Sequence, residues 1–326
     1  MAEVTYLEAL RQGMWEEMER DESVFILGED VGLYGGAFKV TDGFAKRFGE
    51  SRVIDTPISE AAIVGAAAGA AHMGMRPVAE MQFIDFISCA YDMLTNYVAT
   101  ARYRAGLSTP IVVRGPCGGY VRGGPFHSQN PEAAFFHTPG LKIVYPSTAR
   151  DAKGLIKSSI RDPDPVLYLE HKWLYRRIKE QLPEGEEVLT PIGEARLARE
   201  GKDLSIVTYG ATVWKSLEAA ERMEQEDGLG VEVLDLRTLL PLDDAAIMRS
   251  VKKTNKVLIV HEDTRTGGLA GEIAARINEQ AFEFLDGPIM RVTAHDVPLP
   301  YAPTLEDFVL PQTEDIVKAA RWLANY

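Results

Sequence analysis

Short apolar runs alternate with amphipathic stretches along the first half of the chain. Continuous apolar runs are typical of strands buried on both faces of a parallel sheet. They lie at Val24–Leu27, Arg52–Asp55, Pro77–Phe83, Pro110–Arg114, Leu141–Tyr145 and Pro165–Glu170. Helical spacing of apolar residues predicts helices over Thr5–Glu19, Ile87–Tyr103 and Ser147–Ile160. This alternation predicts an α/β domain with a doubly wound parallel sheet over residues 1–180.

The pattern breaks over residues 181–202, which are charged and contain Pro183, Gly185 and Pro191. We interpret this stretch as a linker. A second alternation of strands and helices follows over residues 203–326. Its apolar runs are Leu204–Tyr209, Val231–Leu236, Val257–Val260 and Ile289–Val292. The chain is therefore expected to form two doubly wound α/β domains.

One stretch, Val53–Gly69, combines a strand end, a tight turn and a helix of small residues. Pro57 and Ser59 are typical of a turn and a helix start, and Glu60 stands at the join. Gly65 and Gly69, four residues apart, share one helix face. Because glycine lowers helix stability, this face is expected to pack closely against another subunit.

Ligands of open parallel sheets bind at the carboxyl ends of the strands. Glu29, Glu60, Phe86 and His127 all follow predicted strands, so we expect them to gather at one edge. Other interpretations of these residues stay open at this point. The helix dipole also favours an acid at the position of Glu60, Glu29 also fits a solvated loop, and a lone histidine is more often structural.

Composition narrows the class of function. The chain has 326 residues and a net charge of 35 − 48 = −13, which disfavours nucleic acid or an anionic membrane as the main partner. No apolar run reaches the roughly 20 residues of a membrane span. Only two cysteines occur, Cys89 and Cys117, and no secretory signal is visible. We therefore expect a reducing, cytoplasmic location.

Several familiar motifs are absent. No Gly-x-Gly-x-x-Gly with a distal acid follows a strand, and no phosphate-binding P-loop or Gly-x-Ser-x-Gly elbow occurs. The chain also lacks a Gly-Asp-Gly followed by asparagine some thirty residues later.

Seven ordered motifs carry a family resemblance over essentially the whole length. They are Gly28-Glu29-Asp30-Val31, Asp55-Thr56-Pro57-Ile58-Ser59-Glu60, Arg76-Pro77, Arg114-Gly115-Pro116, His127-Ser128-Gln129, Asp151-Ala152-Lys153-Gly154-Leu155 and Leu236-Arg237-Thr238. With them the chain resembles the beta subunits of thiamine-diphosphate-dependent 2-oxo acid dehydrogenases of the pyruvate, branched-chain and acetoin types.

The resemblance implies a transketolase-like pyrimidine-binding domain followed by a transketolase-like C-terminal domain. It implies an alpha subunit as partner in an alpha2-beta2 heterotetramer, with a lipoyl acyltransferase core receiving the acyl group. The alpha subunit would hold magnesium and the diphosphate through a Gly-Asp-Gly…Asn motif, and the lack of that motif here agrees with a beta role.

Roles for single residues are also implied by the resemblance. Glu60 matches the acid that hydrogen-bonds the pyrimidine ring of thiamine diphosphate, and Phe86 the ring packed against it. Glu29, Ile58 and Gln82 match residues near the same end of the cofactor. His127 matches a histidine that assists acyl transfer to the lipoyl group. Matches to a potassium-binding loop of relatives are Ile111, Ser159, Ile160, Asp162 and Asp164, here interrupted by prolines.

The substrate is left open by the sequence. The segment Asn130–Phe136 resembles branched-chain members, whereas Phe284–Asp286 and Ala294–Pro298 resemble pyruvate members. Two other functions also remain open. One is a non-catalytic scaffold subunit that docks the acyltransferase core, and the other is an acetoin-cleaving relative. A fragment of transketolase or of deoxyxylulose-phosphate synthase is a weaker alternative, because those chains carry their own diphosphate motif.

Overall fold

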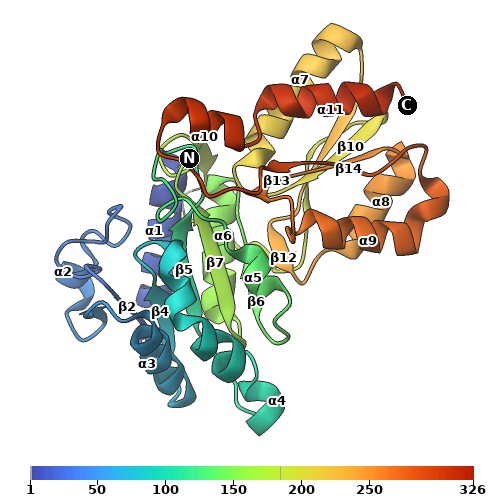
Figure 1. Ribbon diagram of the computed structural model, residues 1–326. Coiled ribbons are helices and arrows are strands. Elements are labelled where there is room, and N and C mark those ends of the chain that lie inside the picture. The colour runs from blue at the N-terminus through green and yellow to red at the C-terminus, as the bar shows by residue number, and fades with distance from the viewer. Residues whose placement is uncertain (1, 184) are drawn as a thin grey trace. The chain divides into compact units, whose positions relative to one another are not determined.

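The computed structural model describes residues 2–183 and 185–326, which form two compact units (Figure 1). The first unit comprises the chain up to Cys117 and Ala134–Ile192. The second comprises Gly118–Ala133 and Gly193–Tyr326. The glycine-rich segment 118–133, which the sequence places within the first domain, thus belongs to the second unit.

The first unit contains a sheet whose strands run in the order β6-β7-β5-β4-β2-β3, with every neighbouring pair parallel. The strands are β2 (Val24–Gly28), β3 (Val53–Asp55), β4 (Arg76–Glu80), β5 (Val112–Cys117), β6 (Lys142–Val144) and β7 (Val166–His171). A separate antiparallel pair joins β1 (Ala2–Thr5) to β8 (Lys179–Leu182). Each of the six strands overlaps a strand predicted from the sequence. Burial of a strand on both faces selects for apolar residues, which makes such strands visible in the sequence.

Helices cover both faces of this sheet. Helix α1 (Tyr6–Arg20) packs with α6 (Ala149–Arg161), and α3 (Glu60–His72) packs with residues 84–98 on the other side (Figure 1). The short helices α2 (Phe44–Phe48), α4 (Ala101–Ala105) and α5 (Glu132–Phe136) complete the unit, α5 where the chain returns from the second unit. Thr5 caps the N-terminus of α1, because its hydroxyl accepts from the Glu8 N–H at 3.2 Å.

The prediction of one continuous helix over Ile87–Tyr103 is wrong. The segment forms a 3₁₀ helix η1 (Ile84–Ala90), a π-helical stretch η2 (Met93–Val98) and then α4. Two threonine hydroxyls bond carbonyls four residues earlier, Thr95 to Tyr91 at 2.9 Å and Thr100 to Asn96 at 2.6 Å. Such side-chain bonds compete with regular helix geometry, which the spacing of apolar residues does not reveal.

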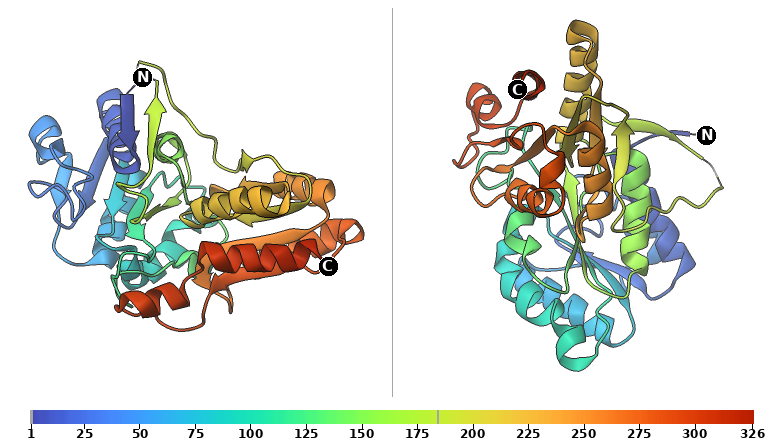
Figure 2. Two further views of the ribbon diagram at one scale, coloured as in Figure 1. Left: turned by 90° about the horizontal axis from the view of Figure 1, so that it is seen from above. Right: turned by 90° about the vertical axis from the view of Figure 1, so that its right-hand side faces the viewer.

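The second unit contains a sheet in the order β14-β13-β10-β11-β9. Its strands are β9 (Arg196–Arg199), β10 (Leu204–Thr208), β11 (Val231–Asp235), β13 (Val257–Thr264) and β14 (Met290–Ala294), and β12 (Thr238–Leu240) follows β11. Helices α7 (Thr212–Asp227) and α11 (Thr313–Ala324) pack side by side, as do α8 (Asp244–Thr254) and α9 (Ala270–Ala281) (Figure 2). The 3₁₀ helix η3 (Phe282–Phe284) follows α9, and α10 (Pro303–Val309) precedes α11.

Strand β9 lies inside the predicted linker 181–202. It pairs antiparallel with β11 at the edge of the sheet, and Arg196 donates to the Asp235 carboxylate at 2.9 Å. Charged residues are common on edge strands because one side of such a strand stays unpaired. The charged residues of this stretch therefore gave no apolar pattern from which the strand could be predicted. The wider prediction of two α/β domains is confirmed.

The register of the first sheet aligns the carboxyl ends of its central strands. Gly28 pairs with Asp55 on one side and with Glu80 on the other, and Glu80 pairs with Arg114. These strand ends therefore bring the following loops to one edge. Among the described residues, no helix combines the length and apolar character needed to cross a bilayer.

Candidate active site

The turn between β3 and α3 is held by the strand next to it. The Thr56 N–H donates to the Gly28 carbonyl at 2.9 Å, and the Gly32 N–H donates to the Asp55 carboxylate at 2.6 Å. Ser59 stands at the helix N-cap, but its side chain makes no capping bond. Glu60 is thus the first residue of α3, where the helix dipole favours a negative charge.

Glu29 and Glu60 come together at this edge. Each is only 8% exposed. Burial raises the pKa of Glu29, and the Glu60 carboxylate and Asp30 act in the same direction. Two buried acids close enough to influence each other are typical of a site that handles protons.

The other predicted site residues lie in the turn before α3 and in the segment after β4. Phe86 is half-buried and lies edge-on to Phe83, with ring centroids 6.4 Å apart, and Phe83 in turn meets Phe38 at 5.5 Å. The Gln82 amide donates to Asp30 at 3.0 Å. Ile58 is 81% exposed and projects from the turn itself. The first unit therefore holds these predicted site residues in the segments that directly follow β2, β3 and β4: Glu29, Ile58, Glu60, Gln82 and Phe86.

Helix α3 leaves its small-residue face open. Ile63, Val64 and Ala67 are buried, whereas Ala66 and Gly69 are exposed. A Cβ added at Gly69 would meet no heavy atom within 4 Å. At Gly65 a Cβ would meet only the Met93 methyl group, at 3.2 Å. No packing within the described part of this chain explains a glycine at position 69.

His127 belongs to the second unit, on the segment 118–133, and is half-buried there. Its N–H donates to the Gly124 carbonyl at 3.3 Å, and the Gly118 N–H donates to the Gln129 carbonyl at 3.0 Å. These bonds fold the segment into a compact loop. The acid pair thus lies in the first unit and His127 in the second.

A buried ionic network, which sequence reasoning missed, lies beneath the acid pair in the first unit. Arg114 bonds Glu80 on one side and Glu170 on the other, and Tyr175 donates to Glu170 at 2.6 Å. Arg114 and Glu170 are at most 1% exposed. Burial raises the pKa of Glu80, although Arg114 opposes the change. In the sequence, the sign of this network was an arginine in one apolar strand and a glutamate in each of two other apolar strands.

The residues matched to a potassium loop do not fit that ion. Arg76 donates to the Ile160 carbonyl at 2.7 Å, Lys142 binds the Asp162 carboxylate at 2.7 Å, and Arg102 binds Asp164. The Ile111 carbonyl accepts from the N–H of residue 166. Cationic side chains thus already neutralise this loop, where a metal ion would be repelled. No group of three His, Cys, Asp or Glu side chains suited to a metal occurs in the described residues.

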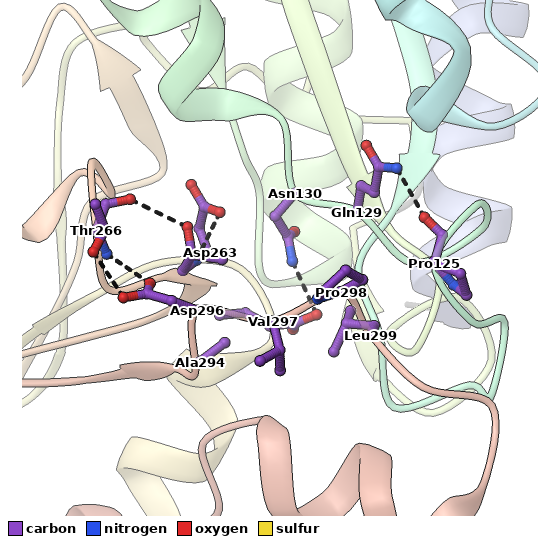
Figure 3. A pocket seen from close by; sticks show the side chains of 12 residues that line it. Pro125, Gln129, Asn130, Asp263, Thr266, Ala294, Asp296, Val297, Pro298 and Leu299 are labelled. Atoms are coloured by element: carbon purple, nitrogen blue, oxygen red, sulfur yellow. Dashed lines mark hydrogen bonds between the residues drawn. The ribbon is translucent and has the colours of Figure 1, made fainter.

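The second unit has a cavity of about 500 Å³ beside the histidine loop (Figure 3). Its polar wall is formed by Asn130, Glu262, Asp263, Thr266 and Asp296, and Val297–Leu299 line the apolar wall. Burial raises the pKa of Asp263 to about 6, with Glu262 and Asp296 acting in the same direction. Burial lowers the pKa of the neighbouring His261 to about 4.

Two models of known domain families match the chain. The transketolase pyrimidine-binding domain matches residues 2–177, and the transketolase C-terminal domain matches residues 193–316. A Bacillus subtilis protein named 2-oxoisovalerate dehydrogenase subunit beta is 50% identical over the full length of both chains. A Staphylococcus aureus protein named pyruvate dehydrogenase E1 component subunit beta is 44% identical over 98% of each chain.

A solved structure described as a split-gene transketolase, inactive beta4 tetramer, is similar with a TM-score of 0.80. It is 23% identical and covers 99% of this chain and 98% of its own. At that identity the likeness shows the fold alone, which agrees with the two α/β units.

The opposed pKa shifts of Asp263 and His261 give a test of the second unit. The pKa of Asp263 is raised, so its contribution to stability is present below its ordinary value of 3.8 and is lost as the pH rises through 6. The pKa of His261 is lowered, so its contribution is present above 6.5 and is lost as the pH falls through 4. Each shift corresponds to about 3 kcal/mol, and the two effects oppose each other between about pH 4 and 6.

We therefore expect Asp263→Asn to raise the free energy of unfolding at pH 7.5. From pH 6.5 to 4.5 that free energy should then fall more steeply than in the wild type, because only the His261 effect remains. Urea unfolding between pH 7.5 and 4.5 measures the free energy of unfolding at pH 7.5 and its decrease towards low pH. The exposed Asp286→Asn variant is the control, and parallel curves for Asp263→Asn and wild type would contradict the assignment.

Proposed function

Because the chain belongs to the E1 beta subunits of 2-oxo acid dehydrogenase complexes, which are built from transketolase-like domains, we propose that it acts with an alpha subunit and thiamine diphosphate. The reaction is oxidative decarboxylation of a 2-oxo acid, with transfer of the acyl group to a lipoyl group. The observation that carries this proposal is the buried pair Glu29 and Glu60, at an edge flanked by an open helix face.

The donor set of the first unit suits one end of the cofactor. A buried carboxylate and a half-buried phenyl ring fit an aminopyrimidine, which offers ring nitrogens for hydrogen bonds and flat faces for packing. The Thr56 hydroxyl oxygen is also buried there without a hydrogen-bond partner among the described residues. Glu60 and Phe86 would hold the pyrimidine, with Glu29, Ile58 and Gln82 around it.

Nothing in this donor set suits a diphosphate. The chain lacks a Gly-Asp-Gly…Asn motif, and the loops after β2 and β3 present carboxylates at this edge, which repel phosphate. We propose that the alpha subunit holds the diphosphate and magnesium. When bound, thiamine diphosphate supplies the electron sink for loss of carbon dioxide from a 2-oxo acid.

Glu60 acts by holding a proton at a pyrimidine ring nitrogen. Its burial at the start of α3 keeps the carboxyl group away from water, so its hydrogen bond is less screened. Burial and the neighbouring Glu60 carboxylate raise the pKa of Glu29, which favours the protonated form of Glu29 beside Glu60. This chain thereby controls the protonation of the cofactor ring.

The alpha subunit is proposed to cover the exposed face of α3. Exposed apolar residues lie on loops at the same edge of the first unit, with Leu33 at 86% and Ile58 at 81% exposure. Large exposed apolar side chains beside a small-residue face are typical of an interface between subunits. Docking to a lipoyl acyltransferase core is proposed from family membership alone.

The named relatives point to two substrate classes, a branched-chain 2-oxo acid and pyruvate. The two classes share the carboxylate and 2-oxo group and differ in the size of the side chain. An assay of the assembled enzyme with pyruvate, branched-chain 2-oxo acids and acetoin distinguishes them.

Glu60→Gln is expected to lower the decarboxylation rate of the assembled enzyme by about 10²-fold or more, because an amide cannot hold and release the proton. The matched control is Glu50→Gln, an exposed acid of the same unit, which should retain wild-type activity. Full activity of Glu60→Gln would remove the proposed role of Glu60. A complex that assembles and binds the cofactor but never turns over, even with wild-type sequence, would instead indicate a scaffold.

Gly69→Leu is expected to block assembly with the alpha subunit while leaving the chain folded. A Cβ at this position meets no heavy atom within 4 Å, and replacing a helical glycine raises helix propensity by up to about 1 kcal/mol. Gel filtration of co-expressed subunits and thermal unfolding of this chain measure the two effects. Gly69→Ala is the graded control, and normal assembly of Gly69→Leu would place the interface elsewhere.

A further inference from the structure

The second unit has the strand arrangement of an open sheet with a ligand-binding crevice. Strand β10 lies between β11 and β13, parallel to both, and the chain changes direction across the sheet at β10 and β13. In such sheets the crevice lies outside the carboxyl ends of the two strands where the order reverses. Here those ends are Thr208-Tyr209 and Glu262-Asp263.

Segment 118–133 of the same unit binds to both strand ends. The Tyr209 hydroxyl donates to the Glu132 carboxylate at 2.9 Å. The Glu262 carboxylate accepts from the Gly119 N–H and, at 3.0 Å, from the Asn130 side-chain amide. The position that a small ligand takes in other open sheets is thus taken by the loop that carries His127.

Glu262 closes the base of this loop. Its single oxygen Oε1 accepts from residues on both sides of His127, eleven positions apart in the chain. Glu262 is 6% exposed, and hydrogen bonds to a buried carboxylate are stronger than those between neutral groups. A Cβ at Gly119 would lie 2.6 Å from a Leu310 methyl group, so Leu310 would have to move to make room for a larger residue.

The loop is anchored at its tip by a second acidic site. The Arg122 N–H donates to Glu306 at 3.0 Å, and the Arg122 guanidinium binds Glu306 and Asp307. Within the loop, the Gln129 amide donates to the Pro125 carbonyl at 2.8 Å. The tip and base are therefore fixed separately. At the base, Glu262 joins Gly119 to Asn130 across His127, next to the backbone bond from Gly118 to Gln129.

We propose that Glu262 is a positioning residue for His127: by joining Gly119 to Asn130 it holds the histidine loop in the conformation needed for acyl transfer to the lipoyl group. This inference rests on the proposed function and on the role in acyl transfer that the family resemblance implies for His127. Glu262 does not itself handle the reacting atoms. Its effect is confined to the step that needs His127.

The test uses the enzyme assembled with its alpha subunit. Decarboxylation is followed with an artificial electron acceptor, and acyl transfer is followed with a lipoyl domain. In Glu262→Ala the ratio of acyl transfer to decarboxylation should fall about tenfold. Glu262→Gln should restore most of this ratio, because one amide oxygen can still accept both hydrogen bonds.

Asn130→Ala removes one of the two bonds and should give a smaller fall in the same ratio. Hydrogen exchange of the amides of residues 118–130 should be faster in Glu262→Ala than in the exposed control Glu279→Ala. An equal loss of both activities, or unchanged exchange and an unchanged ratio, would overturn the proposal.

His127→Ala is measured beside these variants. If it leaves acyl transfer intact, the proposed role of His127 fails and the positioning role of Glu262 fails with it. If it impairs acyl transfer while Glu262→Ala does not, only the inference about Glu262 fails.

Discussion

The edge that carries the acid pair depends on Arg114, a cation buried between two carboxylates. It connects β5 to β4 through Glu80 and to β7 through Glu170. An unpaired charge at such a depth would cost about 3–5 kcal/mol, so this network favours the register in which the three strands pair. The loop after β2 packs against this network. A Cβ at Gly36 in that loop would lie 3.2 Å from the Glu80 carboxylate.

Chemistry is divided between the two units in this arrangement. The first unit presents the buried acids Glu29 and Glu60, to which we assign the proton handling, beside a helix face on which a Cβ at Gly69 meets no heavy atom of the described residues. The second unit uses the crevice of its sheet to hold the loop with His127. A chain that offers carboxylates and a histidine, but no group for a diphosphate, is consistent with one half of a site completed by an alpha subunit.

Much of this was predictable from the sequence, because buried parallel strands and a turn with a lone acid leave local patterns. The strand ends at Gly28 and Asp55 follow from the sequence pattern, whereas the next strand, expected over Pro77–Phe83, ends at Glu80. The role of Glu60 does not follow from the sequence pattern, since a helix dipole explains an acid at this position equally well. Only the burial of Glu60 and the neighbouring Glu29 favour a catalytic role. The assignment of segment 118–133 to the second unit was hidden because it depends on contacts with Tyr209 and Glu262, about 80 to 140 positions later. The charge balance around Asp162 likewise depends on Arg76 and Lys142, which are distant in the chain.

The central claim is that this chain supplies one part of a shared cofactor site. Calorimetric titration of thiamine diphosphate with magnesium tests it most directly, comparing this chain alone with the complex formed with its alpha subunit. The account predicts no measurable binding by the chain alone and one cofactor bound per alpha–beta pair in the complex. Tight binding by the chain alone would contradict it.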